Sequence, residues 1–189
     1  ILADESEVQV FDRDEARLNL IGTIQVPGNQ IHSVNAADLD GDGRAEIYIS
    51  ANDPRTPGSM AVEWDGKQFA ILFKNARWYI RPMDIPGTGP VLLGQAAGSV
   101  PVTEGIYVLA VNNGSLEQQE RLPLPGKVNL FNFAYADIDG DGKKEVVALD
   151  ESFKLQVVRG GSVSWKSEER FCGTKRFVGG EPRMRPGTT

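Results

Sequence analysis

The sequence has very few of the side chains that usually carry nucleophilic or redox chemistry. It contains one cysteine, Cys172, and one histidine, His32, among 189 residues. A single cysteine excludes an internal disulfide, a zinc site built from several thiolates and a two-cysteine redox motif. With a single histidine, we find no cysteine or serine nucleophile that has a plausible neighbouring base in the sequence. We therefore interpret His32, at the start of an expected strand, as structural.

Long apolar runs and a surplus of positive charge are also missing. No stretch approaches the roughly 18 consecutive apolar residues that a membrane-spanning helix needs, so we expect no membrane span in this segment. The chain carries 20 Lys and Arg against 26 Asp and Glu, a formal net charge of −6. Phosphate binding needs a basic stripe and none is visible, so we expect no nucleic-acid partner.

Turn-forming residues, in contrast, are abundant. The 21 glycines and 11 prolines fall between short apolar runs, and 40% of the residues are hydrophobic. Short apolar runs that are separated by Gly and Pro are typical of all-β proteins with many turns.

One nine-residue pattern of acidic residues and glycines occurs twice. It reads DLDGDGRAE from Asp38 to Glu46 and DIDGDGKKE from Asp137 to Glu145, and a short apolar run follows each copy. Carboxylates at alternate positions of a loop repel one another, so a hard divalent cation is a natural partner for them. Calcium takes six to eight oxygens in a flexible geometry, and glycine at the sixth position allows a sharp turn. The pattern therefore predicts two calcium loops.

Two other interpretations of this pattern are less consistent with it. An EF-hand needs a glutamate at position twelve between two helices, whereas position twelve is Ile49 or Ala148, inside an apolar run. A single copy could also be a hairpin turn, since Asp and Gly favour such turns. Two copies with identical offsets favour calcium.

The pattern D-x-D-G-D-G-x-x-E followed by an apolar strand resembles the calcium loops of the FG-GAP and VCBS repeat families, the integrin-α-like β-propellers. In that family each loop joins the first two strands of a blade and holds the ion through positions one, three, five and nine and a carbonyl at seven. Many family loops carry Asp at position nine, so the longer Glu46 and Glu145 leave direct and water-mediated ligation both open. The resemblance implies these ligands: Asp38, Asp40, Asp42, the Arg44 carbonyl and Glu46 in the first loop, and Asp137, Asp139, Asp141, the Lys143 carbonyl and Glu145 in the second.

A third, weakened copy lies between the two loops. Asp84 matches Asp38 and Asp137, but Pro86 and Thr88 replace the next two carboxylates. We interpret this copy as a turn that has lost its ion. The three copies give a period of about fifty residues, which is typical of propellers and other repeat arrays.

We therefore expect an all-β fold of consecutive four-stranded antiparallel β-propeller blades, about three and a half in number. The expected strands include 78–85 in the second full unit, and 130–138, 145–149 and 162–166 in the third. The expected domains are a propeller segment over 1–178 and a tail at 179–189 that is disordered or enters a further blade. The propeller segment consists of a partial blade at 1–26, a blade with a calcium loop at 27–74, a blade with the degenerate loop at 75–124 and a blade with a calcium loop at 125–170.

The expected function is a non-catalytic, calcium-binding propeller module in which calcium is structural. Its surface then serves as a scaffold for a protein or glycan ligand. Trp64, Trp78 and Trp165 could stack on sugar rings, but their unlike strand positions favour packing between blades. The alternative is a fragment of a propeller enzyme, a polysaccharide lyase or hydrolase, with its catalytic residues mostly outside this chain.

Two expectations concern the wider protein. Three and a half blades cannot close a ring of four to eight, so we expect the chain to belong to a longer polypeptide or to associate with another copy through its exposed blade faces. Open calcium loops suit millimolar calcium, so we expect an exported protein, periplasmic or at the cell surface, as in bacterial members of the family it resembles.

Overall fold

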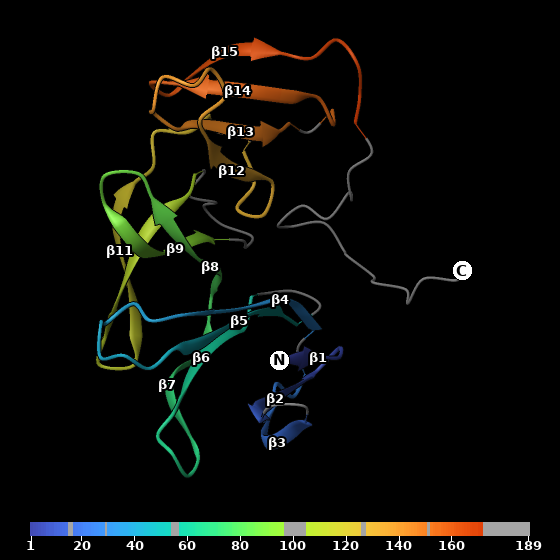
Figure 1. The fold of residues 1–189 in the computed structure, drawn as a ribbon, viewed down its shortest axis with the longest axis vertical. Helices are drawn as coiled ribbons and strands as arrows, with labels where there is room; N and C mark the ends of the chain where they lie inside the picture. Colours follow the sequence, from blue (N-terminus) through green and yellow to red (C-terminus); the bar gives the residue numbers. More distant parts are fainter. Residues whose placement is uncertain are drawn as a thin grey trace.

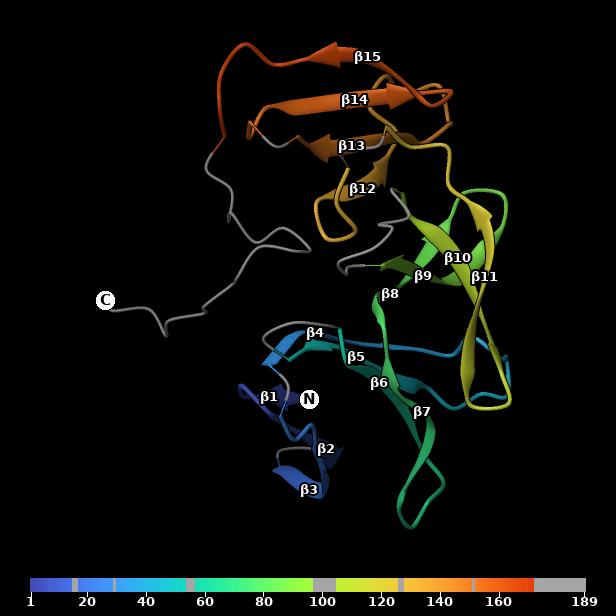
Figure 2. The same ribbon diagram turned by 180° about the vertical axis from the view of Figure 1, so that it is seen from behind.

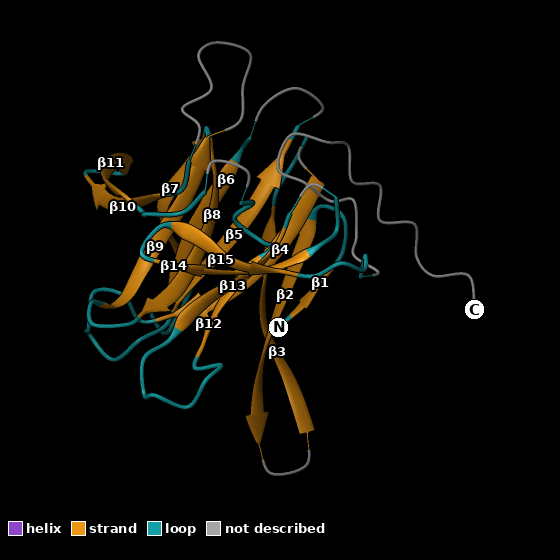
Figure 3. Cartoon of the chain, turned by 90° about the horizontal axis from the view of Figure 1, so that it is seen from above, coloured by secondary structure: helices purple, strands orange, loops and turns teal. Residues whose placement is uncertain are grey.

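The computed structural model describes residues 1–14, 17–28, 30–53, 57–96, 105–125, 128–150 and 152–171. All regular structure in these ranges is β-strand, and no helix occurs among them (Figure 3). Nor do these ranges contain a helix long and apolar enough to cross a membrane. Cys172 and the predicted tail at 179–189 lie outside the described residues. The all-β prediction is confirmed for the part of the chain that the structure describes.

The strands form four separate antiparallel sheets, and each sheet pairs strands that are consecutive in the sequence. The first sheet contains β1 (Leu2–Ala3), β2 (Glu7–Asp14) and β3 (Arg17–Gln25). The second contains β4 (Gln30–Ala37), β5 (Glu46–Asn52), β6 (Ser59–Trp64) and β7 (Phe69–Ala76). The third contains β8 (Trp78–Ile85), β9 (Gly89–Ala96), β10 (Tyr107–Asn112) and β11 (Ser115–Arg121). The fourth contains β12 (Phe133–Ala136), β13 (Glu145–Leu149), β14 (Leu155–Arg159) and β15 (Ser162–Lys166).

The sheets follow one another along the long axis of the molecule in sequence order (Figures 1 and 2). Hairpin turns connect the last two strands of the second, third and fourth sheets. Between β10 and β11, Asn113 and Gly114 both adopt positive φ angles, of 48° and 78°. An Asn-Gly pair with positive φ at both positions is the turn that matches the twist of a two-residue hairpin.

Each pair of consecutive sheets shares one hydrophobic core. The first core joins the first and second sheets through Val8, Val10 and Ile24 on one side and Ile47, Ile49, Met60 and Val62 on the other. The second core joins Tyr48, Ala61 and Phe73 to Ile80, Leu92, Tyr107 and Leu109. The third core joins Tyr79, Ile85 and Leu93 to Phe133, Val146, Ala148 and Val158. The sheets are therefore stacked face to face.

The two middle sheets are covered on both faces, and their inner strands show this in their sequences. β5 is buried at six consecutive positions, with Ile47 and Ile49 in the first core and Tyr48 in the second. On β8 the neighbours Tyr79 and Ile80 likewise point into different cores. A continuous apolar run is what a strand buried on both faces requires.

The observed strands agree with the predicted ones at most positions. β8, β13 and β15 have the predicted bounds, whereas β12 covers only 133–136 of the predicted 130–138. Leu130 precedes the strand and is fully buried. Its N–H donates to Gln95 Oε1 at 3.0 Å and its carbonyl accepts from Arg81 Nη1 at 3.1 Å. Side chains of the third sheet thus satisfy this backbone in place of strand pairing.

The tryptophans do not share one role. Trp78 is partly buried against the core between the second and third sheets, as predicted. Trp64 contacts Phe69 of its own sheet, with ring centroids 5.0 Å apart. Trp165 is 51% exposed on β15, so it does not pack between described sheets.

Burial of the strands predicts which side chains stabilise the stack. Ile49→Ala removes a fully buried side chain from β5 and should cost about 2–5 kcal/mol of unfolding free energy. The matched variant Ile71→Ala truncates an isoleucine of the same sheet that is 56% exposed, and it should cost less than about 1 kcal/mol. Urea denaturation measures both. Equal losses would contradict the assignment of the core.

Candidate metal centres

The two acidic loops occupy equivalent places in two sheets. The first connects β4 to β5, and the second connects β12 to β13. In both sheets these are the first two strands of a four-stranded set. The expected position of the loops within their units is therefore the observed one.

The backbone of both loops is held by the same set of hydrogen bonds. The first aspartate accepts through Oδ1 from the N–H of the residue three positions later, at 2.7 Å in each loop, and through Oδ2 from the residue five positions later. The glutamate at position nine accepts from the N–H at position two, Leu39 at 2.9 Å or Ile138 at 3.1 Å. The loop shape thus follows from side chains that bond their own backbone.

Glycines make this compact path accessible. Gly41 and Gly43 have φ angles of 77° and 88°, and Gly140 and Gly142 have 77° and 85°. These values lie in the left-handed region, which glycine enters without the steric cost that a Cβ brings. The glycine pattern that was noted in the sequence is therefore a requirement of the turn.

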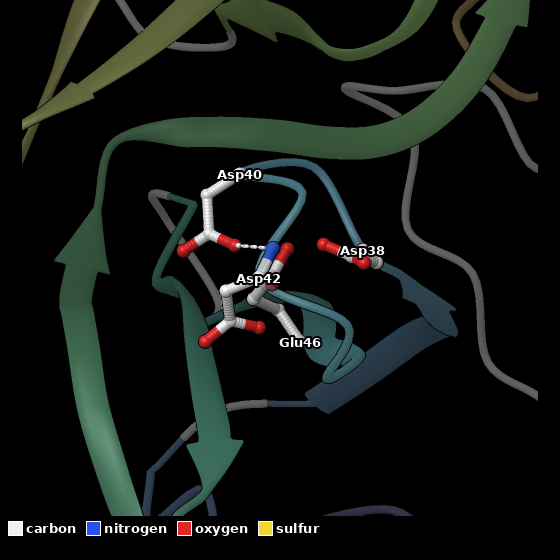
Figure 4. Close-up of side chains that lie close together, drawn as sticks. All are labelled: Asp38, Asp40, Asp42 and Glu46. Carbon is white, nitrogen blue, oxygen red and sulfur yellow. Dashed lines mark hydrogen bonds between the residues drawn. The ribbon is translucent and has the colours of Figure 1, made fainter.

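Four carboxylates converge in the first loop (Figure 4). Asp38, Asp40, Asp42 and Glu46 each offer one oxygen, and these four oxygens lie within 4.8 Å of one another. The aspartates are exposed, whereas Glu46 is 2% exposed. Glu46 Oε1 is buried and has no hydrogen-bond partner, the one such side-chain atom in the described part of the chain. A buried carboxylate oxygen without a partner is costly, so this atom needs a cation or a donor.

Tyr48 holds the other oxygen of Glu46. Its hydroxyl donates to Glu46 Oε2 at 2.8 Å. Burial raises the pKa of Tyr48, and the hydrogen bond to Glu46 raises it further, so the hydroxyl stays protonated and remains a donor. With Leu39 N also bonded to Oε2, the glutamate is oriented so that Oε1 is the free ligand atom.

A second acidic side chain adjoins the first loop. Glu63 on β6 pairs directly with Glu46 on β5 and is 8% exposed. Its Oε1 lies 2.8 Å from Arg44 Nη2, and the same guanidinium nitrogen lies 2.5 Å from Asp42 Oδ2. The hydrogen bonds from the Arg44 side chain and backbone lower the pKa of Asp42. Arg44 thus joins the loop to β6.

The second loop gathers a smaller group of carboxylates. Asp137, Asp139 and Glu145 offer oxygens within 4.8 Å of one another, and the predicted ligand Asp141 is not part of this group. Arg159, at the end of β14, contacts two of the three: Nη2 lies 2.5 Å from Asp139 Oδ2 and Nε lies 3.3 Å from Glu145 Oε1. The two loops therefore share the same backbone hydrogen bonds but have different neighbouring side chains.

The degenerate third copy is a tight turn between β8 and β9. Ile85 pairs with Gly89, and the Thr88 N–H donates to the Ile85 carbonyl at 3.0 Å. Asp84 lies within β8, opposite Pro90, and it belongs to neither of the two carboxylate groups found in the described residues.

Three residues around the loops were not predicted from the sequence: Tyr48, Glu63 and Arg159. All three come from strands beside the loops and not from the repeated pattern. Tyr48 stands two positions after Glu46, where the second copy has Val147, and this difference was visible in the alignment of the copies. Glu63 and Arg159 could have been found only by assuming the register between the second and third strands.

The donor set suits a hard cation. Only carboxylate oxygens converge in the two groups, and neither group contains a histidine or cysteine. Oxygen ligands select calcium, magnesium or manganese over the softer transition metals. The Arg44 and Lys143 carbonyls remain predicted ligands.

Comparison with known proteins adds no assignment. No family model matches this sequence, and a search of the curated proteins finds no match to it. The resemblance to the FG-GAP and VCBS repeats therefore rests on the loops alone.

The contact between Tyr48 and Glu46 can be tested without metal. Tyr48→Phe removes one donor to a buried carboxylate, and the unfolding free energy in chelator should fall by about 1–3 kcal/mol. Tyr107→Phe alters a tyrosine of the same core whose hydroxyl has no hydrogen bond to a carboxylate among the described residues, and it should change the stability less. Urea titrations compare the two variants. A Tyr48 variant as stable as the wild type would contradict the contact.

Proposed function

We propose that the chain is a non-catalytic, calcium-binding β-propeller repeat module in which calcium is structural. The observation that carries the proposal is Glu46 Oε1, a buried oxygen without a partner inside a group of four carboxylates. A calcium ion there supplies the missing partner and neutralises the like charges of the loop.

Calcium suits these loops better than magnesium does. Calcium accepts six to eight oxygens at about 2.3–2.6 Å, including carbonyls and waters, whereas magnesium requires a near-ideal octahedron at about 2.0–2.1 Å. The chain offers carboxylates on a turn that is partly exposed and open to water. In this proposal Asp38, Asp40, Asp42 and Glu46 bind the first ion, and Asp137, Asp139, Asp141 and Glu145 bind the second. The Arg44 and Lys143 carbonyls complete the two sets.

The stack of sheets supports the propeller part of the proposal. Four antiparallel sheets follow in sequence order, three of them four-stranded, and each buries its face against the next sheet. This arrangement is compatible with consecutive propeller blades. Calcium then acts by tying the end of the first strand of a blade to the start of the second.

The proposed role of the module is to present a rigid surface to a protein or glycan ligand. The ions stiffen the turns on one rim and leave the remaining surface for binding. Sites of this open type fill at millimolar calcium, so the proposal places the protein outside the cytosol, in the periplasm or at the cell surface.

A thermal melt in calcium, magnesium and chelator tests the structural role. For a dissociation constant of about 0.1–1 mM and about 1 mM calcium, mass action gives roughly 0.4–1.4 kcal/mol per site. At about 2–4 °C per kcal/mol for a chain of this size, calcium should raise the melting temperature by several degrees, and magnesium should raise it much less.

Three matched variants locate the effect. Asp40→Asn and Asp139→Asn should each remove part of the calcium-dependent shift, because each alters one carboxylate group. Asp84→Asn alters the matching aspartate of the third sheet, which belongs to neither carboxylate group, so this variant should retain the calcium-dependent shift. The proposal fails if the wild-type melt is indifferent to calcium, or if the Asp84 variant loses as much as the other two.

A further inference from the structure

The two calcium loops differ most in the residue that faces the glutamate at position nine. We propose that Arg159 is a tethered counter-cation that competes with the divalent ion at the second loop, so that the two sites fill at different calcium concentrations. This inference rests on the proposed function, because it concerns how those two sites are regulated.

The Arg159 guanidinium contacts carboxylate oxygens that a metal ion in the second loop would otherwise neutralise. It follows Val158, which pairs with Val146, and this register brings its side chain beside Glu145. Its guanidinium lies 2.5 Å from Asp139 Oδ2 and 3.3 Å from Glu145 Oε1. Glu145 is 8% exposed, and its other oxygen accepts the Ile138 N–H. Both oxygens of the buried glutamate are therefore satisfied without a metal ion.

The first loop lacks this arrangement. The strand position that Arg159 holds is occupied there by Glu63, opposite Glu46. The nearby cation is Arg44, a residue of the loop itself, and it contacts Asp42 and Glu63. Glu46 Oε1, the atom equivalent to the one that Arg159 contacts, has no hydrogen-bond partner. Glu46 thus lacks the cationic neighbour that Arg159 provides for Glu145.

The net charges around the two loops support the same conclusion. The first loop with its neighbour has five carboxylates and one cation, a formal charge of −4: Asp38, Asp40, Asp42, Glu46 and Glu63 with Arg44. The second has four carboxylates and three cations, a formal charge of −1: Asp137, Asp139, Asp141 and Glu145 with Lys143, Lys144 and Arg159. A divalent cation is attracted more strongly to the first.

Arg159 has room to leave when calcium enters. Its side chain is 50% exposed, so moving it into water costs little. It also lines an open hollow of about 470 Å³ that includes Asp139, Asp141, Glu145 and the backbone of Gly160 and Gly161. The first site therefore fills at lower calcium, and the second fills only when calcium is high enough to displace the guanidinium.

Calorimetric calcium titrations test the competition. Asp40→Asn disables the first loop and isolates the second. In that background Arg159→Gln should tighten calcium binding about tenfold, which corresponds to about 1.4 kcal/mol. Arg159→Lys keeps the charge and should tighten it less. Arg13→Gln removes an exposed cation on β2 of the first sheet and should leave the affinity unchanged.

A melt without calcium gives a second, independent readout. In chelator Arg159→Gln should melt a few degrees below the wild type, because Glu145 loses its counter-charge, and saturating calcium should abolish the difference. An equal deficit with and without calcium would overturn the competition.

The outcomes separate the two proposals. If the wild type binds calcium but Arg159→Gln leaves the affinity of the second loop unchanged, or shifts both loops equally, the inference is wrong and the proposed function stands. If neither the wild type nor any variant binds calcium, the proposed function is wrong and this inference is wrong with it.

Discussion

The stacking of one sheet on the next is the constraint on which the rest of this structure depends. A middle sheet has apolar residues on both faces, so it needs a neighbour on each side to keep them from water. Burial on both faces includes Glu46, the first residue of β5, which lies opposite Glu63 on β6. A carboxylate is thus carried into a buried position by the strand to which it belongs.

The loop before this strand brings four carboxylates together on a backbone that its own side chains help to shape. Asp38 and Asp137 accept hydrogen bonds from the backbone of their own loops, and these bonds help to fix the shape of the turn. A pre-formed turn lowers the ordering entropy that an incoming ion must offset. What the loop does not satisfy by itself is the charge of its carboxylates and the free oxygen of Glu46. This division of roles explains how the same loop shape occurs at both places with different neighbours.

Much of the fold and of the loops could be predicted from the sequence, because both are local in the chain. Strand periodicity and turn residues placed β8, β13 and β15, and the repeated acidic pattern located both carboxylate groups. The roles of Glu63 and Arg159 could not be predicted in the same way, since their contacts depend on the register between neighbouring strands. Leu130 shows a related limit. Its apolar character predicted a strand, but side chains of another sheet bond its backbone and replace the pairing.

The position opposite the ninth residue of the loop differs between the two copies in the sign of its charge. Glu63 and Arg159 lie outside the repeated pattern, and the substitution between them reverses the sign of the charge beside an otherwise equivalent glutamate. At Glu46 the neighbour adds negative charge and increases the need for a cation, whereas at Glu145 the neighbour is itself a cation. Because a divalent ion is attracted according to the net charge around it, the proposed function lets two loops with matching acidic positions bind with unequal strength. Under the proposed function, the strand register adds to the motif in setting how strongly each loop depends on a metal ion.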